Sequence, residues 1–265
     1  MCQTANFDLS QDMREALRDA ADGEEKPLAR NTLLRILDNS VLAEEKRVPM
    51  CQDTGLVVVF ADVGESARVV GGGLRNAIDA GVRLGYRAGY LRASVVGDPI
   101  LRENTGDNTP AVVYTEVVDG DRLRLRLLAK GGGCENMSRF RMLTPAEGPN
   151  AVVDFVVEAA CAAGPNACPP MVVGVGVGGS FDYSAVLSKK SLLREIGSPN
   201  PLPHVAALER KIHEAINASG IGPQGYGGNT TSLAVQIETA ACHMASLPVS
   251  VNIECHAHRH REVVL

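Results

Sequence analysis

Runs of β-branched residues alternate with segments of helical periodicity along most of this chain. The run at 56–60, bounded by Gly55 and Gly64, is typical of a strand covered on both faces, and a similar run spans 171–177. Between 28 and 42 the apolar residues instead recur at the spacing of a helix. Helices interleaved with strands predict an α/β fold with mixed β-sheets packed against helices.

The other expected elements continue this alternation. Strands are predicted at 111–118, 123–128, 232–238 and 249–253, and helices at 10–20, 74–86, from 151 onward, 183–193 and 203–218. The segment Asp119-Gly120-Asp121, which separates two of these strands, predicts a hairpin turn. Since no repeat or linker divides the chain, we expect a single domain over 1–265, with a helical N-terminal part at 1–48.

Charge and hydropathy argue against several classes of protein. The formal net charge of -5 gives no reason to expect nucleic acid or an anionic membrane surface as a partner. No segment approaches the roughly 18 consecutive apolar residues of a membrane span. The first residues also lack the basic and apolar regions of a secretion signal. We therefore expect a soluble, cytoplasmic protein.

Seven cysteines, an odd number without any Cys-x-x-Cys pair, argue against a disulfide framework or a zinc ribbon. Three of them lie at the ends of predicted strands: Cys51 and Cys168 precede a strand, and Cys255 follows one. Loops at strand ends can converge in space. Three thiolates can hold a four-iron cluster whose remaining iron acts as a Lewis acid. The alternative for any single cysteine, and our interpretation of Cys161, is a small buried apolar residue.

Three glycine-rich segments, at 130–136, 174–180 and 222–229, separate predicted elements. Backbone amides in the run Gly131, Gly132 and Gly133 could bind a carboxylate or a phosphate. The second segment contains Gly-x-Gly-x-Gly-Gly after a strand, which gives a nucleotide site only weak support. A tight turn is the simplest alternative for each segment.

Together these motifs resemble the class I, iron-sulfur-dependent fumarases and the related L-tartrate dehydratases. The matching segments, in family order, are Met50–Gly55, Asn104–Pro110, Lys130–Asn136, Ala167–Pro170, Gly174–Gly179, Gly222–Gly225 and Cys255–Arg259. The resemblance implies the α-domain fold of class I fumarases. It also implies a 4Fe-4S cluster bound by Cys51, Cys168 and Cys255.

The same resemblance implies roles for other residues. Gln52 and Asp53 match residues that line the substrate site, and Asp53 is the candidate that handles the proton of the hydroxyl or water. An aspartate before Thr-Gly also makes an ordinary turn. Arg92 matches an arginine that binds a substrate carboxylate, and the backbone of Gly131–Gly133 matches the second carboxylate contact. His243 matches a histidine that reaches the active site across a subunit interface.

Other residues leave alternatives open. Arg102 is a weaker rival of Arg92. The alternating histidines of 256–260 could indicate zinc or nickel, but their place beside Cys255 favours a cluster loop. Cys134 stands where many fumarases have serine and where relatives of the tartrate dehydratase type can carry cysteine. A role as fourth cluster ligand would leave no iron for the substrate.

The resemblance implies a hydro-lyase, since removal of hydroxide from a β-hydroxy acid needs an electrophile at the oxygen and a base at the neighbouring carbon. Long single-chain relatives carry a second domain that supplies this base, whereas this chain ends at Leu265. We therefore expect an α subunit that needs a β subunit, in an oligomer of α-β pairs, acting on a small dicarboxylate. The first expectation is reversible hydration of fumarate to L-malate, in the tricarboxylic acid cycle. The alternatives are an L-tartrate dehydratase α subunit and, more distantly, a non-catalytic dicarboxylate-binding or interaction subunit.

Overall fold

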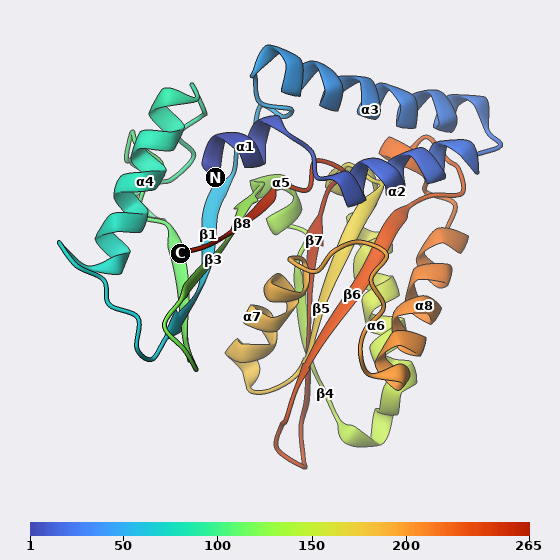
Figure 1. Cartoon of the computed structure of the whole chain (residues 1–265). Helices are drawn as coiled ribbons and strands as arrows, with labels where there is room; N and C mark the ends of the chain where they lie inside the picture. The colour runs from blue at the N-terminus through green and yellow to red at the C-terminus, as the bar shows by residue number, and fades with distance from the viewer. The chain divides into compact units, whose positions relative to one another are not determined.

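The computed structural model describes all 265 residues, and the chain forms two compact units. Unit 1 consists of residues 1–10, 39–132 and 259–265, and unit 2 of residues 11–38 and 133–258. Each unit contains a four-stranded mixed sheet with helices packed against it (Figure 1). The predicted α/β class with mixed sheets is therefore confirmed, while the expectation of a single domain stays a prediction.

Unit 1 is built around strand β1 (Leu56–Gly64), which lies inside the sheet order β2-β1-β3-β8. It pairs parallel with β2 (Val112–Val118) and antiparallel with β3 (Leu123–Lys130), and β8 (His260–Val264) pairs with the other side of β3. Residues Val57–Ala61 of β1 are buried, as a strand covered on both faces requires.

The predicted hairpin between β2 and β3 is wrong, because β1 lies between these two strands. The end of β1 fills the position that a direct β2-β3 pairing would need: the Gly64 amide donates to the Arg122 carbonyl at 2.9 Å. A Cβ on Gly64 would lie 2.6 Å from the Gly120 carbonyl oxygen, so the backbones approach as only glycine allows. The turn at 119–121 therefore crosses the end of β1 instead of joining neighbours.

Two helices pack on one face of the unit 1 sheet: α1 (Cys2–Phe7) and α4 (Leu74–Ala88). Their buried side chains join those of β1 and β3 in one apolar cluster that includes Phe7, Val59, Val82, Tyr86 and Leu127. Burial of such side chains contributes about 1.5–3 kcal/mol each.

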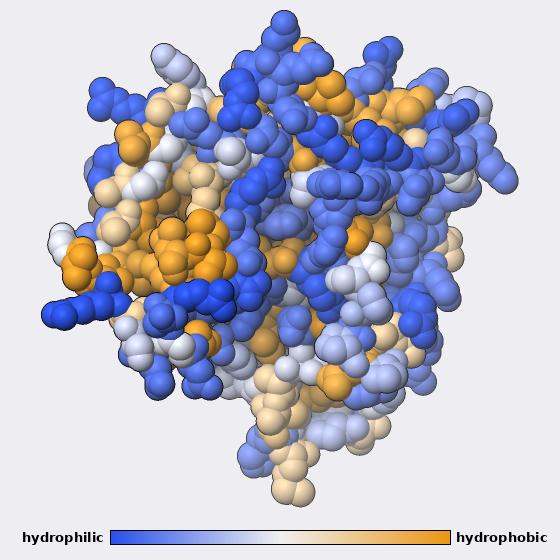
Figure 2. Space-filling view, viewed as in Figure 1, coloured by the Kyte–Doolittle hydropathy of each residue, from blue (hydrophilic) through white to orange (hydrophobic).

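The same face holds an apolar cavity of about 670 Å³. Its lining comes from α1, α4 and the sheet, and includes Leu74, Ile78, Val82, Leu125, Leu127 and Leu265. In Figure 2 an apolar patch is visible over the region where Figure 1 places α4 and this sheet. None of the predicted site residues lines this cavity.

Unit 2 has the strand order β4-β7-β5-β6. The central strand β5 (Met171–Gly178) pairs parallel with β6 (Ser232–Ala240) and antiparallel with β7 (Leu247–Glu254), which in turn pairs with β4 (Arg139–Leu143). One face of the sheet forms the main core with α6 (Gly148–Ala163) and α8 (Pro203–Ala218); the core includes Met171, Val173, Val175, Ile212 and Ile237.

The other face of β5 packs against α7 (Phe181–Ser191), because successive strand residues point to opposite faces. Gly174 and Gly176 alternate with the core valines and face the helix. A Cβ on Gly176 would lie 2.0 Å from the Ser184 carbonyl oxygen, and one on Gly174 would lie 2.2 Å from the Ser188 carbonyl oxygen. These two glycines of the glycine-rich segment therefore serve close helix packing.

The remaining elements are α2 (Gln11–Asp22), α3 (Pro27–Lys46), the short helix α5 (Gly132–Glu135) and three 3-10 turns at Pro145–Glu147, Gly164–Ala167 and Pro223–Gly225. The other predicted helices and strands are present with their ends shifted by a few residues. The strands β4 and β8 and the helices α1 and α5 were not predicted. No helix combines the length and the apolarity that a bilayer span requires.

Candidate active site

The loop that precedes β1 places Asp53 beside the start of the glycine run at Gly131 and Gly132. One carboxylate oxygen, Oδ1, accepts a hydrogen bond from the Gly55 amide at 3.0 Å, which is the ordinary turn expected of Asp-Thr-Gly. The other, Oδ2, accepts from the Gly132 amide at 2.8 Å. A Cβ on Gly131 would lie 3.5 Å from this same oxygen. Asp53 and two of the three predicted glycines thus form one polar site.

Arg259 supports the Asp53 loop from below the surface. This arginine is 1% exposed, and its guanidinium Nη1 donates to the Asp53 carbonyl oxygen. Nη1 also lies 3.4 Å from the side-chain oxygen of Asn6 on α1. A Cβ on Gly131 would come within 3.1 Å of Nη2, so the glycine leaves room for the guanidinium. Arg259 therefore fixes the backbone on which Asp53 is carried.

Two further buried side chains hold the same loop through its carbonyl groups. The Tyr86 hydroxyl lies 2.6 Å from the Thr54 carbonyl oxygen and 3.0 Å from that of Gly55. Asn108 donates to the Gly55 carbonyl at 3.1 Å and accepts from the Ser94 amide at 2.7 Å. Burial raises the pKa of the Tyr86 hydroxyl well above its usual value, so it stays a neutral donor.

Arg92 lies on the loop that Ser94 and Asn108 tie to this site. Its side chain is exposed, and its carbonyl oxygen accepts a hydrogen bond from the Thr54 hydroxyl at 3.1 Å. Arg102 belongs to a separate turn, where its amide donates to the Asp98 carbonyl at 2.9 Å. The structure thus connects the loop of Arg92, rather than the turn of Arg102, to the segment that carries Asp53.

Replacing Tyr86 by phenylalanine tests how firmly the Asp53 loop is held. We expect the free energy of unfolding to fall by about 1–3 kcal/mol, because buried carbonyl oxygens lose their donor. Chemical denaturation measures the change. Tyr90→Phe is the control, since this side chain is 94% exposed and its hydroxyl should contribute little. Equal stability of the two variants would contradict the role assigned to Tyr86.

In unit 2 the loops that carry Cys168 and Cys255 are joined. Nδ1 of His256 lies 2.9 Å from the Cys168 carbonyl oxygen. Gln224 strengthens the junction, because its side-chain amide donates to the Pro169 carbonyl at 2.9 Å and lies 3.2 Å from Nδ1 of His256. Two of the three predicted cluster ligands therefore belong to one group of loops.

Cys134 lies beside Cys255 in the same unit. The sulfurs of these two residues and a carboxylate oxygen of Glu254 all lie within 4.8 Å of one another, and all three residues are buried. The Cys134 thiol also donates to the Ala167 carbonyl at 3.5 Å, next to Cys168. Thiolates and a carboxylate are ligands that metal ions accept in proteins, so this group of side chains could bind a metal ion.

The third predicted ligand, Cys51, belongs to unit 1, where its half-buried thiol donates to the Gln52 side-chain oxygen at 3.5 Å. Its convergence with the cysteines of unit 2 stays a prediction. His243 is exposed in the turn between β6 and β7, at the opposite end of β7 from Cys255. A strand of eight residues spans about 26 Å, so the two side chains of one copy are far apart.

The histidines that follow Cys255 do not gather at one point. His256 contacts the carbonyl of Cys168, whereas His258 is 1% exposed and its Nε2 lies 2.7 Å from the Leu192 carbonyl oxygen. His260 begins a strand of unit 1. The contacts of His256 and His258 therefore hold the segment that follows Cys255 against two neighbouring loops, and a cluster at this segment stays a prediction.

Comparison with known proteins gives a consistent result. The family model described as fumarate hydratase (Fumerase) matches residues 1–264. A Methanocaldococcus jannaschii protein named putative L(+)-tartrate dehydratase subunit alpha is 40% identical over 260 residues, which cover 95% of this chain and 90% of that relative. The L(+)-tartrate dehydratase alpha subunits of Escherichia coli strains UTI89 and K12 are 36% and 35% identical, over 95% of this chain and 84% of each relative. The resemblance inferred from the motifs is confirmed: the chain belongs to the fumarate hydratase (Fumerase) family of hydro-lyases.

Proposed function

We propose that this chain is the α subunit of a two-subunit hydro-lyase that dehydrates L-tartrate or a closely related hydroxy diacid. The observation that carries the proposal is the site in unit 1, where the Asp53 carboxylate meets the Gly132 amide. The relatives described above are named as tartrate dehydratase subunits, which favours this substrate over fumarate, the first expectation from the motifs.

Cys51, Cys168 and Cys255 are the residues proposed to hold a 4Fe-4S cluster. When bound, the cluster supplies a Lewis acid for the departing hydroxyl group. The contact of His256 with the Cys168 carbonyl supports the proposal that Cys168 and Cys255 bind the same cluster. Cys134, although close to Cys255, is proposed to line the site without binding iron, since a fourth thiolate would block the substrate.

The chain's own polar groups bind and orient the diacid in this proposal. The Gly131–Gly133 backbone binds one carboxylate, because consecutive amides form a concave anion site. Arg92 binds the other, since its exposed guanidinium can donate two parallel hydrogen bonds. Asp53, oriented by the Gly55 and Gly132 amides, takes up or returns the proton of the hydroxyl or water. Gln52 lines the site beside it.

The remaining catalytic groups are proposed to come from other chains. The relatives are named as alpha subunits, which supports a β subunit as the source of the base that removes the carbon-bound proton. His243 would serve the site of a second copy, since it lies at the end of β7 remote from Cys255. An oligomer of α-β pairs would satisfy both requirements. A cytoplasmic location stays a prediction.

Anaerobic reconstitution with the β subunit, followed by a panel of L-tartrate, D-tartrate and L-malate, tests the function. We expect the pair to dehydrate L-tartrate, and the chain alone to bind iron but turn over no substrate. Cys168→Ser and Cys255→Ser should lose iron, whereas Cys161→Ser on α6 should keep it.

Other results would overturn parts of the proposal. Full turnover by the chain alone would remove the need for a partner, and no turnover of any diacid by the pair would remove the hydro-lyase assignment to this site. Equal diacid affinity of the metal-free and cluster-loaded forms, without turnover, would favour a binding subunit.

A further inference from the structure

Lys189 on α7 is a buried lysine, 8% exposed. Its Nζ donates to both carboxylate oxygens of Glu135, at 2.6 and 2.7 Å. Lysine is seldom buried without a charged partner, and this pair has the short contacts of charge-assisted hydrogen bonds. Glu135 directly follows Cys134 and ends the short helix α5.

Asn252 holds the same carboxylate from the sheet. This side chain is 4% exposed on β7, three positions before Cys255, and donates to Oε2 of Glu135 at 2.9 Å. It also lies 2.9 Å from the Ser138 hydroxyl. Glu135 is therefore tied to a helix and to the strand that leads to Cys255.

Helix α7 also holds the segment that follows Cys255. The carbonyl of Leu192, the residue after the helix end at Ser191, lies 2.7 Å from Nε2 of His258. Helix α7 and the residue that follows it thus hold both cysteines. Cys134 is held through the ion pair of Glu135 with Lys189, and Cys255 through the contact of His258 with the Leu192 carbonyl. The distance between this helix and the sheet is fixed, because the helix backbone packs directly against Gly174 and Gly176 of β5.

We propose that Lys189 is a positioning residue for the hydro-lyase site. Through Glu135, and together with Asn252, it holds Cys134 and the end of the carboxylate-binding glycine run in register with Cys255. The role rests on the proposed function, since it concerns the same site. Lys189 itself touches neither the substrate nor the cluster in this account.

Alkylation of Cys134 in the full chain, prepared anaerobically without metal, tests the positioning step. Cys134 is 5% exposed and reacts only when its segment opens locally. We expect Lys189→Met to raise the rate at which Cys134 reacts with iodoacetamide about tenfold. This change is equivalent to a free energy of local opening that is lower by about 1.4 kcal/mol. The milder variant Asn252→Ala should raise it in the same direction. Lys211→Met, an exposed lysine of α8, is the matched control and should leave the rate unchanged.

A double-mutant cycle separates positioning from general destabilisation. If Lys189 acts through Glu135, the combined variant Lys189→Met/Glu135→Gln should alkylate no faster than the quicker single variant. If the alkylation rate of the double variant instead rose by the product of the two single effects, the proposal would be overturned. An unchanged Cys134 rate would also overturn it, as would a rise that is fully accounted for by a lower free energy of global unfolding, measured by urea denaturation.

The reconstituted α-β enzyme supplies a functional readout. Lys189→Met should lower kcat on L-tartrate about tenfold while the iron content stays normal, and Lys189→Arg should recover part of the loss because it keeps a charged donor. Wild-type kcat in Lys189→Met would overturn the proposal. Since the alkylation assay needs neither substrate nor cluster, an inactive wild-type pair would refute the proposed function without deciding the role of Lys189.

Discussion

Gly176→Ala is expected to lower the free energy of unfolding of unit 2 by about 3 kcal/mol or more, the upper end for an overpacked core position. The added Cβ would lie 2.0 Å from the Ser184 carbonyl oxygen and 2.7 Å from the Ser188 amide nitrogen. Both atoms belong to the backbone of α7, so no side chain can rotate away. Urea denaturation followed by circular dichroism measures the loss.

Gly81→Ala is the matched control. Gly81 lies inside helix α4, where a Cβ would meet no atom within 4 Å. Alanine is favoured over glycine in a helix by about 1 kcal/mol, so this variant should be slightly stabilised. If both variants kept wild-type stability, the close seating of α7 on β5 would be refuted.

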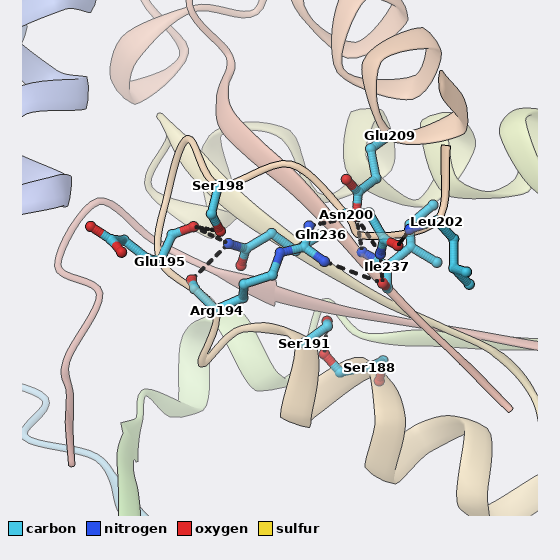
Figure 3. A network of polar contacts seen from close by, with 10 residues as sticks. All are labelled: Ser188, Ser191, Arg194, Glu195, Ser198, Asn200, Leu202, Glu209, Gln236 and Ile237. Atoms are coloured by element: carbon cyan, nitrogen blue, oxygen red, sulfur yellow. Dashed lines mark hydrogen bonds and ion pairs between the residues drawn. The ribbon is translucent and has the colours of Figure 1, made fainter. Parts of the chain in front are cut away.

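Glu209→Ala is expected to cost about 3–5 kcal/mol, as when one partner of a buried ion pair is removed. Figure 3 shows Glu209 reaching from α8 into a polar network with β6 and the segment that follows α7. Its Oε1 accepts from the Arg194 guanidinium and from the Ile237 amide, the latter at 2.7 Å. The two side chains of the ion pair are only 17% and 9% exposed, so water cannot replace the lost acceptor well.

Glu214→Ala, an exposed glutamate on the same helix, provides the comparison and should change stability by less than about 0.5 kcal/mol. Thermal denaturation at low and high salt should show the same large loss for Glu209→Ala, because a buried pair is weakly screened. If Glu209→Ala lowered the free energy of unfolding by less than about 1 kcal/mol, the ion pair would behave like a solvent-exposed one instead.

The network also explains how the edge strand of unit 2 is covered. β6 is the last strand of its sheet and would otherwise present unpaired backbone groups. The side chain of Gln236 donates to the Arg194 carbonyl at 2.7 Å, and the Asn200 side chain donates to the Ile237 carbonyl at 2.8 Å. The segment around 194–202 therefore covers this edge with side-chain hydrogen bonds.

The sequence predicted the buried strands well and the edge strands poorly. β1 and β5 are continuous apolar runs, which the burial of both faces demands. β4 (Arg139–Leu143) is exposed at four of its five positions, and β8 begins with His-Arg-Glu, so neither carries an apolar pattern. Such strands form because the neighbouring strand, β7 for β4 and β3 for β8, has backbone groups available for hydrogen bonds. The wrong hairpin between β2 and β3 has the same origin, since pairing with β1 depends on contacts remote in sequence.

The candidate site could be predicted only in part. The motifs brought out Asp53 and the glycines, which the structure places together. They did not single out Tyr86, Asn108 or Arg259 as supports of the loop. These residues act on backbone carbonyl groups, and a carbonyl acceptor is present at every position of a chain. The only sequence signals were the place of Asn108 inside the motif Asn104–Pro110 and the place of Arg259 at the end of the last motif.

Because α7 packs directly against Gly174 and Gly176, a substitution that disturbs this part of the core also disturbs the geometry of the proposed site. A helix lifted by about 1 Å would lengthen the contacts of Lys189 with Glu135, now 2.6 and 2.7 Å, past the usual limit of a hydrogen bond. A variant at these glycines that still folded would therefore lose the alignment of Cys134 with Cys255. Directed evolution for thermal stability should leave this pair of glycines untouched, even where selection ignores catalysis.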